Sequence, residues 1–279
     1  MNPRFVALGA ISSAMAATLL LSACGSGGGE PPPPPAPQTQ INAANMVDSY
    51  AIGAGAFEQG LLIQGLWQLA AVSVQLDPQP GSHACPGGGS YQYSVAGQTA
   101  TLSFSHCSTA QFQFAAGSIS YTSGLQGAND WDVTVQDLQL APATDPAATR
   151  VVKGTLQHRF GSDAVHYVNS GSFELQRKGR TDKLSLQASY LLQNMAAVPE
   201  STQLSLQTAR FAQALQVQAS GAALNAVTVS SAGDGSSVTG IAQALGSLRL
   251  DLRSKPSDAP LSSQQLSQAE LEAAMKRVD

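Results

Sequence analysis

The chain has 279 residues, and its 14 Lys and Arg against 18 Asp and Glu give a formal net charge of −4 at pH 7. Only 11% of the residues are charged and no basic stripe is present, which argues against a nucleic-acid partner. The hydrophobic fraction of 43% is large enough for a packed core and argues against a disordered chain.

The first 23 residues have the order of a secretory signal peptide. Arg4 supplies a positive start, residues 5–21 are mostly apolar, and the small residues Ser22 and Ala23 follow. The apolar part is shorter than the roughly 20 residues of a membrane-spanning helix, and Ser and Thr interrupt it. We expect residues 1–23 to be removed on export.

The sequence Leu21-Ser22-Ala23-Cys24 at the end of this segment resembles the lipobox of bacterial lipoproteins. The resemblance implies that Cys24 is acylated and becomes the mature N-terminus, so the membrane is the expected partner through stable, multiple acyl chains. Gly25 follows in place of Asp. By similarity to enterobacterial lipoproteins, this implies the outer membrane, with the periplasmic or surface face left open.

Residues 24–40 are rich in glycine and proline and are interpreted as a tether. Residues 25–29 contain four glycines and are expected to be flexible, whereas the proline run 31–35 favours a stiff, extended spacer. We expect residues 41–279 to form a single domain of helix and β-sheet beyond this tether.

Residues 42–76 are predicted to be helical. Apolar residues recur at helical spacing from Met46 through Tyr50 and Phe57, and Asn42 and Asn45 are possible N-caps. Glycine costs up to about 1 kcal/mol within a helix, so the glycines of this stretch either permit close packing or divide it into two helices. These glycines are Gly53, Gly55, Gly60 and Gly65.

From Tyr91 onward the apolar period changes from 3.6 to 2, which is typical of strands. Tyr91-Tyr93-Val95 and Ala100-Leu102-Phe104 flank a turn at Ala96-Gly97-Gln98 and predict a hairpin that ends at Cys107. Eight further alternating runs follow: Trp131-Val133-Val135, Leu156-His158-Phe160, Phe173-Leu175, Leu184-Leu186-Ala188-Tyr190-Leu192, Leu204-Leu206, Leu215-Val217-Ala219, Val227-Val229 and Leu248-Leu250-Leu252. The intervening residues are mostly polar, which indicates an antiparallel sheet with one buried face.

These runs predict about ten to twelve strands, and a sheet of that size tends to curl. The expected fold is mainly β (α+β): an N-terminal helix covers the apolar face of a large curved antiparallel sheet, either a half-barrel or a closed roll. Pro256 and Pro260 are expected to end the last strand. A short polar C-terminal helix is predicted over 263–278, with Leu266, Leu271, Ala274 and Met275 on one side.

Cys85 and Cys107 remain as a pair once Cys24 is acylated, and an exported pair is expected to form a disulfide. Each cysteine has a histidine nearby, His83 and His106, so the four side chains are also a possible zinc set. The spacing does not match a C-x₂-C knuckle. We therefore predict a disulfide and no metal.

No motif for nucleophilic catalysis, phosphate binding or a zinc protease is present. The chain has four histidines, His83, His106, His158 and His166; His158, on the apolar phase of its run, is either a core residue or a ligand or general base in the concavity of the sheet. Asp130, Asp132 and Asp234 are candidates for calcium but are too few for six oxygens and suit turns better. Trp67 and Trp131 could stack on a ligand, although core packing explains both. We predict no enzyme and no cofactor.

Part of the chain looks like uncharacterised proteobacterial lipoproteins. The likeness lies in the run Cys85-Pro86-Gly87-Gly88-Gly89, which leads through two predicted strands to Phe104-Ser105-His106-Cys107, and in the earlier stretch Ile41-Asn42-Ala43. This resemblance implies an envelope protein and carries no site residues. Periplasmic and outer-membrane lipoprotein carriers offer a fold-level analogy, since they also pack helices into an incomplete β-barrel.

Three functions follow as hypotheses. The first is a lipid-anchored, non-catalytic structural or adhesive module of the envelope. The alternative is a binder or carrier of a lipid or other hydrophobic ligand in the concavity of the sheet, and the third is an enzyme. A filled concavity would favour the first, and an open apolar cavity the second.

Overall fold

The computed structural model describes residues 36–76, 79–110, 112–123, 130–193, 196–220, 226–243 and 246–278. Side chains are described throughout these ranges except at positions 61, 64–76, 196, 197 and 220. Residues Ala36–Asp279 form one compact unit. The predicted signal peptide, Cys24 and residues 24–35 of the predicted tether lie outside the described residues.

The first element is a single helix, α1 (Met46–Leu76), which confirms the helical prediction and shows that the glycines do not divide it. Buried residues occur at successive positions, including Tyr50, Ala51 and Ile52, so this part of α1 is buried around most of its circumference. Before α1, the Asn45 Oδ1 accepts a hydrogen bond of 2.8 Å from the Asn42 backbone N–H. Among the described residues, no helix has the length and apolar character needed to cross a membrane.

One antiparallel sheet of fifteen strands accounts for the rest of the described fold apart from a second helix. The strands are β1 (Gly81–Ala84), β2 (Ser90–Ala96), β3 (Thr99–Ser105), β4 (Cys107–Ser108), β5 (Phe112–Ser123), β6 (Trp131–Pro142), β7 (Arg150–Phe160), β8 (His166–Arg177), β9 (Arg180–Gln193), β10 (Ala196–Gln207), β11 (Leu215–Ser220), β12 (Ala226–Ser231), β13 (Ser237–Ala242), β14 (Leu248–Arg253) and β15 (Ser262–Leu266).

Apart from β4, which pairs only with β5, the strands follow one another across the sheet in chain order. The predicted hairpin is β2–β3, and its turn contains Gly97 with a positive φ of 62°. The sheet begins at β1 and ends at β15, and the described residues contain no pairing between these two edge strands. The sheet is therefore open, and the prediction of ten to twelve strands was too low.

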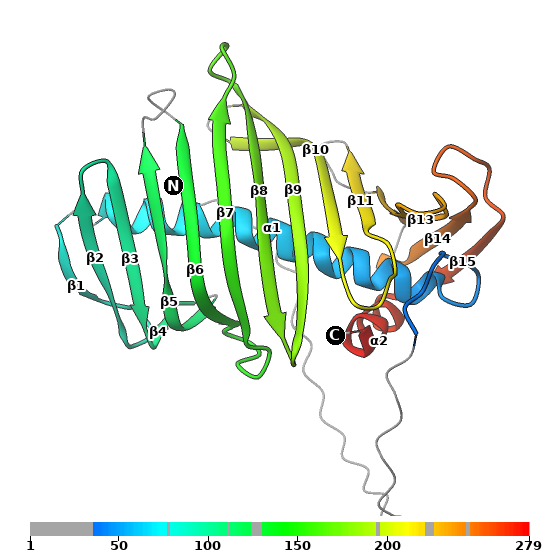
Figure 1. Ribbon diagram of the computed structural model, residues 1–279, viewed down its shortest axis with the longest axis horizontal. Helices are drawn as coiled ribbons and strands as arrows, with labels where there is room; N and C mark the ends of the chain where they lie inside the picture. The colour runs from blue at the N-terminus through cyan, green and yellow to red at the C-terminus, as the bar shows by residue number, and fades with distance from the viewer. Residues whose placement is uncertain are drawn as a thin grey trace, which may run out of the picture. The chain divides into compact units, whose positions relative to one another are not determined.

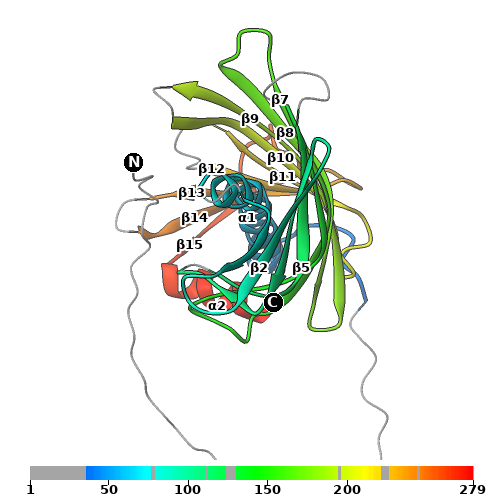
Figure 2. The same cartoon turned by 90° about the vertical axis from the view of Figure 1, so that its left-hand side faces the viewer.

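The sheet curves around α1, which lies along its concave side (Figures 1 and 2). α1 contacts β5 and β9 to β14. Residues of the inner face pair in continuous rows, and in one of them every side chain except the glycine is buried. That row is Val133, Leu156, Gly171, Leu186, Leu204, Val217, Val229, Val238 and Leu252.

The C-terminal helix, α2 (Gln268–Val278), packs against α1. A capping box begins it, because the Ser267 N–H donates to Glu270 Oε2 at 2.8 Å and the Glu270 N–H donates to Ser267 Oγ at 3.3 Å. The predicted helix over 263–278 was therefore wrong in its first turn. Residues 262–266 instead pair with β14 as β15, so the last strand also lies after Pro256 and Pro260.

Candidate functional site

Cys85 and Cys107 lie at the distance of a disulfide bond, with an S–S separation of 1.96 Å and Cα atoms 5.4 Å apart. The nearby histidines do not converge on the sulfur atoms. His83 stacks on Tyr91 at 5.1 Å between ring centroids, and His106 is exposed with a φ of 49°. Within the part of the chain that the structure describes, no group of three or more His, Cys, Asp or Glu residues could hold a metal ion.

His158 is a buried core residue that bonds to a neighbouring strand. Its Nδ1 lies 2.6 Å from Asn169 Oδ1, and its ring centroid lies 4.7 Å from that of Tyr167. Burial lowers the pKa of His158. His166 is exposed, and the hydrogen bond that its imidazole donates to the Asp163 carboxylate raises the pKa of His166. The two histidines therefore occupy opposite environments.

The aspartates considered for calcium serve local structure. Asp130 Oδ1 accepts the Phe160 N–H at 3.1 Å, and Asp132 pairs with the Arg159 guanidinium. Asp234 Oδ1 accepts the N–H and the hydroxyl of Ser236 at 3.1 and 2.7 Å.

Of the two tryptophans considered for stacking, Trp131 is half-buried, 5.5 Å from the Tyr121 ring. The Trp67 side chain lies outside the described ones.

The outer face of the sheet carries an unbroken row of small polar side chains across ten consecutive strands of the path, from β2 to β12. All of its residues are serine or threonine except one glutamine, and none is buried. This hydroxyl row consists of Ser94, Thr101, Ser120, Thr134, Thr155, Ser172, Ser185, Ser205, Gln216 and Ser230. Adjacent strands lie about 4.8 Å apart, so the hydroxyls repeat at that interval.

A second row runs beside the hydroxyl row and is dominated by amides. This amide row consists of Gln157, Ser170, Gln187, Gln203 and Gln218, all of them at least partly exposed. Two shallow hollows open over the hydroxyl row, and the smaller one also extends over the amide row; their volumes are about 810 and 570 Å³. Both are lined by Thr155, Ser172, Ser185 and Ser205. The smaller hollow is lined mainly by groups that both donate and accept hydrogen bonds, whereas charged and apolar residues also line the larger one.

Four charged side chains on the outer face flank the hydroxyl row and line the larger hollow, and three of them form ion pairs. Lys153 and Lys183 lie 2.8 and 3.5 Å from the two carboxylate oxygens of Glu174. The hydrogen bond from Lys153 lowers the pKa of Glu174, which keeps this carboxylate ionised. The hydroxyl row itself contains no charged residue.

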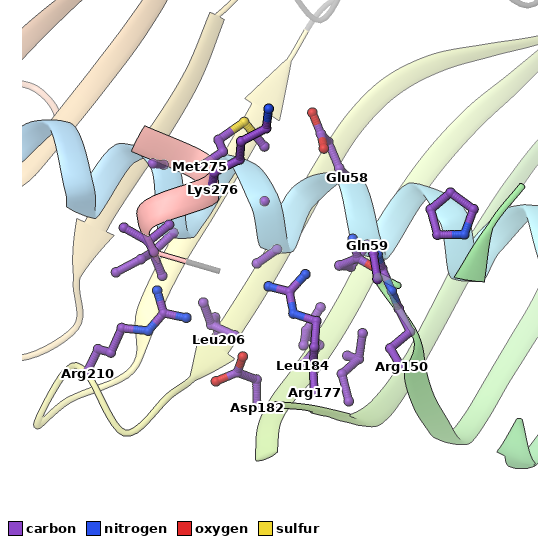
Figure 3. Close-up of a pocket in the computed structure, with 18 of the residues that line it drawn as sticks. Glu58, Gln59, Arg150, Arg177, Asp182, Leu184, Leu206, Arg210, Met275 and Lys276 are labelled. Carbon is purple, nitrogen blue, oxygen red and sulfur yellow. The ribbon is translucent and has the colours of Figure 1, made fainter. Parts of the chain in front are cut away.

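On the inner side, one pocket of about 280 Å³ lies beneath α1 and next to α2, at the ends of β7 to β10 (Figure 3). Three arginines line it: Arg150 at the start of β7, Arg177 at the end of β8 and Arg210 after β10. Its apolar walls include Ile52, Leu184, Leu206 and Met275, among others. None of these arginines was predicted from the sequence as a site residue.

Neither the outer rows nor the pocket could be read from spacing alone. The alternation of Ser, Thr and Gln marks an exposed strand face, but only the strand register aligns these residues into rows. The arginines are far apart in the sequence and occur near strand ends without a motif.

No family model matches the chain, and no curated protein or solved structure matches it. Function therefore has to follow from the chemistry of the outer face and of the pocket.

Proposed function

We propose that this protein is a lipid-anchored protein of the cell envelope that acts without catalysis, as an adhesive module for a neutral glycan. The glycan binds across the hydroxyl row and the amide row of the outer face. The observation that supports this proposal is the continuity of the hydroxyl row over ten strands, with hollows of about 810 and 570 Å³ above it.

The chemistry of the rows suits sugar hydroxyls. Serine and threonine hydroxyls and glutamine amides all donate and accept hydrogen bonds, as sugar hydroxyls do. A ladder with a regular repeat of about 4.8 Å offers such groups along an extended polymer. Because the hydroxyl row is uncharged, it gives no electrostatic advantage to a polyanion, and no apolar residue in it would favour an apolar protein surface.

The filled concave side favours an adhesive module over a carrier of a large hydrophobic ligand. The inner-face side chains Leu204, Val217 and Val229 are each 1% exposed or less beneath α1. Helix α1 therefore occupies the space in which such a ligand would lie in an empty half-barrel (Figure 2).

The lipid anchor in this proposal rests on the resemblance of the sequence at Cys24 to a lipobox. Acyl chains on this cysteine would hold the domain at the membrane, and the Gly- and Pro-rich tether would give it reach. The predicted location is the outer membrane.

The proposal is tested by affinity electrophoresis of the full-length protein in gels that contain neutral polysaccharides, after a screen on an array of neutral oligosaccharides. We expect the wild-type protein to be retarded. The double variant Gln187→Ala/Gln203→Ala removes two exposed amides from the second hollow. At about 1 kcal/mol per hydrogen bond, the affinity should fall about tenfold or more.

The matched control is Gln92→Ala/Gln265→Ala, which removes two exposed amides from β2 and β15, outside both hollows. This control should migrate like the wild-type protein. Equal retardation of all three proteins, or no retardation of the wild-type protein by any neutral glycan, would refute the proposal.

A further inference from the structure

The pocket beneath α1 gathers cationic groups from several elements. Arg150, Arg177 and Arg210 reach it from the ends of the strands, and Lys276 reaches it from α2. Figure 3 shows Arg177 and Arg210 extending toward the space below α1. Electrostatic repulsion among these groups is part of the reason, after burial, that the pKa of Arg177 falls to about 10.

Several of the polar atoms at this pocket are buried without a partner. Arg150 is 7% exposed, and one of its terminal nitrogens donates to Gln59 Oε1 on α1. Within the described residues, Arg150 Nε and Arg210 Nε and Nη1 are buried and have no hydrogen-bond partner. An unpaired buried donor on a charged group costs free energy, so a pocket that holds three of them is suited to an acceptor ligand.

The balance of charges in the pocket indicates the charge of the ligand that it would bind. Four cationic side chains line it against the carboxylates of Glu58, Asp145 and Asp182, and Arg180 lies close enough to lower the pKa of Arg177 further. Burial raises the pKa of Glu58 and outweighs the opposing effect of the nearby Arg150 charge. The pocket therefore retains excess positive charge where the donors are unpaired.

The arginine forks match the oxygens of a phosphate group, which they bind in pairs. Asp182 Oδ1 is buried, and no described residue donates a hydrogen bond to it. This acceptor beside the arginines suits a hydroxyl of the same ligand. The apolar walls, among them Leu184 and Leu206, limit access of water and strengthen these interactions.

We propose that this pocket binds a phosphate ester that carries a neighbouring hydroxyl group, with Arg177 and Arg210 on the phosphate and Asp182 on the hydroxyl. Such a group occurs in small soluble esters and in the head groups of glycerol-based lipids. The volume of about 280 Å³ fits a head group or a small ester. This inference does not depend on glycan binding, because the pocket and the outer rows lie on opposite faces of the sheet.

The test is isothermal titration calorimetry of the full-length protein in detergent with four probes: glycerol 3-phosphate, a short-chain phosphatidylglycerol, inorganic phosphate and glycerol. We expect saturable binding of one or both esters, weaker binding of phosphate and none of glycerol. Tighter binding of the soluble ester assigns the source to free phosphate esters, and tighter binding of the lipid assigns it to head groups. Arg210→Gln should weaken binding of the ester at least about tenfold, as expected for one charged hydrogen bond.

The matched control is Lys255→Gln, which changes the net charge equally on an exposed loop outside the pocket. It should leave the affinity within about twofold of the wild-type value. Thermal melts establish that each variant folds, and a bound ester should raise the melting temperature of the wild-type protein.

If Arg210→Gln does not fold, Arg210→Lys serves instead. It keeps the charge without the planar fork and should also weaken binding. The proposal fails if no ester binds saturably, if the arginine variant binds like the wild-type protein, or if Lys255→Gln weakens binding as strongly.

Discussion

Gly53 of α1 lies directly against Val229 of β12: a Cβ atom on Gly53 would be 2.3 Å from Val229 Cγ2. The helix can approach the concave face this closely only because the side chain is absent. Gly55, two residues further along the same helix, has the opposite environment, since its Cβ would meet only Met275 Cε at 3.9 Å. Substitutions at Gly53 and Gly55 can therefore be compared to test how α1 packs on the sheet.

Gly53→Ala should destabilise the protein by about 1–3 kcal/mol, because the added methyl overpacks the contact with Val229. Gly55→Ala should stabilise it by roughly 0.5–1 kcal/mol, because alanine favours the helix and has room. Denaturant unfolding of both variants measures the difference. Similar effects of the two substitutions would mean that α1 does not pack on β12 in this way.

The two faces of β9 should respond differently to truncation. Leu186 is 4% exposed on the inner face, so Leu186→Ala should cost about 2–5 kcal/mol through lost burial and the remaining cavity. The neighbouring Gln187 is exposed on the outer face, and Gln187→Ala should change the free energy of unfolding by less than about 0.5 kcal/mol. Denaturant melts decide the issue, and a small effect at Leu186 would contradict a packed concave side.

His158 should make the protein less stable in mild acid. Burial lowers the pKa of His158 in the folded state below the ordinary 6.5. Between the folded-state pKa and the unfolded-state pKa, the unfolded chain therefore binds a proton at His158 that the folded chain does not. Its contribution to stability is present above about pH 6.5 and is lost as the pH falls below that value.

His166 has the opposite sign, because its raised pKa contributes stability at low pH that is lost as the pH rises through the folded value. The measurement therefore compares His158→Gln/His166→Gln with His166→Gln alone, by unfolding between about pH 5 and pH 7.5. The double variant should show the flatter dependence. Identical pH profiles would mean that His158 is not buried in its neutral form.

The lipid anchor is tested at Cys24. Cys24→Ser should abolish palmitate labelling and leave an unprocessed or soluble precursor in place of the membrane-bound protein, because acylation supplies the attachment. Cell fractionation with metabolic palmitate labelling measures both effects. A wild-type protein without label, with an unchanged membrane fraction in the variant, would disprove the anchor.

Local periodicity was sufficient to predict α1 and most of the sheet, but it failed where the sheet is irregular. In β5, Phe112 and Phe114 lie on one phase of the alternation and Ile119 and Tyr121 on the other, because the register shifts between 114 and 118. Because the bulge moves the apolar residues from one phase to the other, the alternating pattern does not reveal β5. The same limitation applies to the outer rows, since the register of distant strands depends on such bulges and on turns.

At the C-terminus, the start of α2 could have been predicted from the sequence, but the strand β15 could not. Ser267 and Glu270 have the spacing of a capping box, which could have placed the start of α2 from the sequence. That residues 262–266 form an edge strand depends on their pairing with β14 and not on their own pattern. The arginine pocket likewise arises from three strand ends that only the fold brings together.

The measurement that tests the central claim most directly compares two variants with two ligands. Neutral-glycan affinity and glycerol 3-phosphate affinity are measured for the wild-type protein, for Gln187→Ala/Gln203→Ala and for Arg210→Gln. If the glycan binds to the outer face of the sheet, the double glutamine variant should lose affinity for the glycan and keep its affinity for glycerol 3-phosphate. Arg210→Gln should keep its affinity for the glycan. Glycan affinity that survives the double variant, or that disappears with Arg210→Gln, would contradict recognition by the outer face of the sheet.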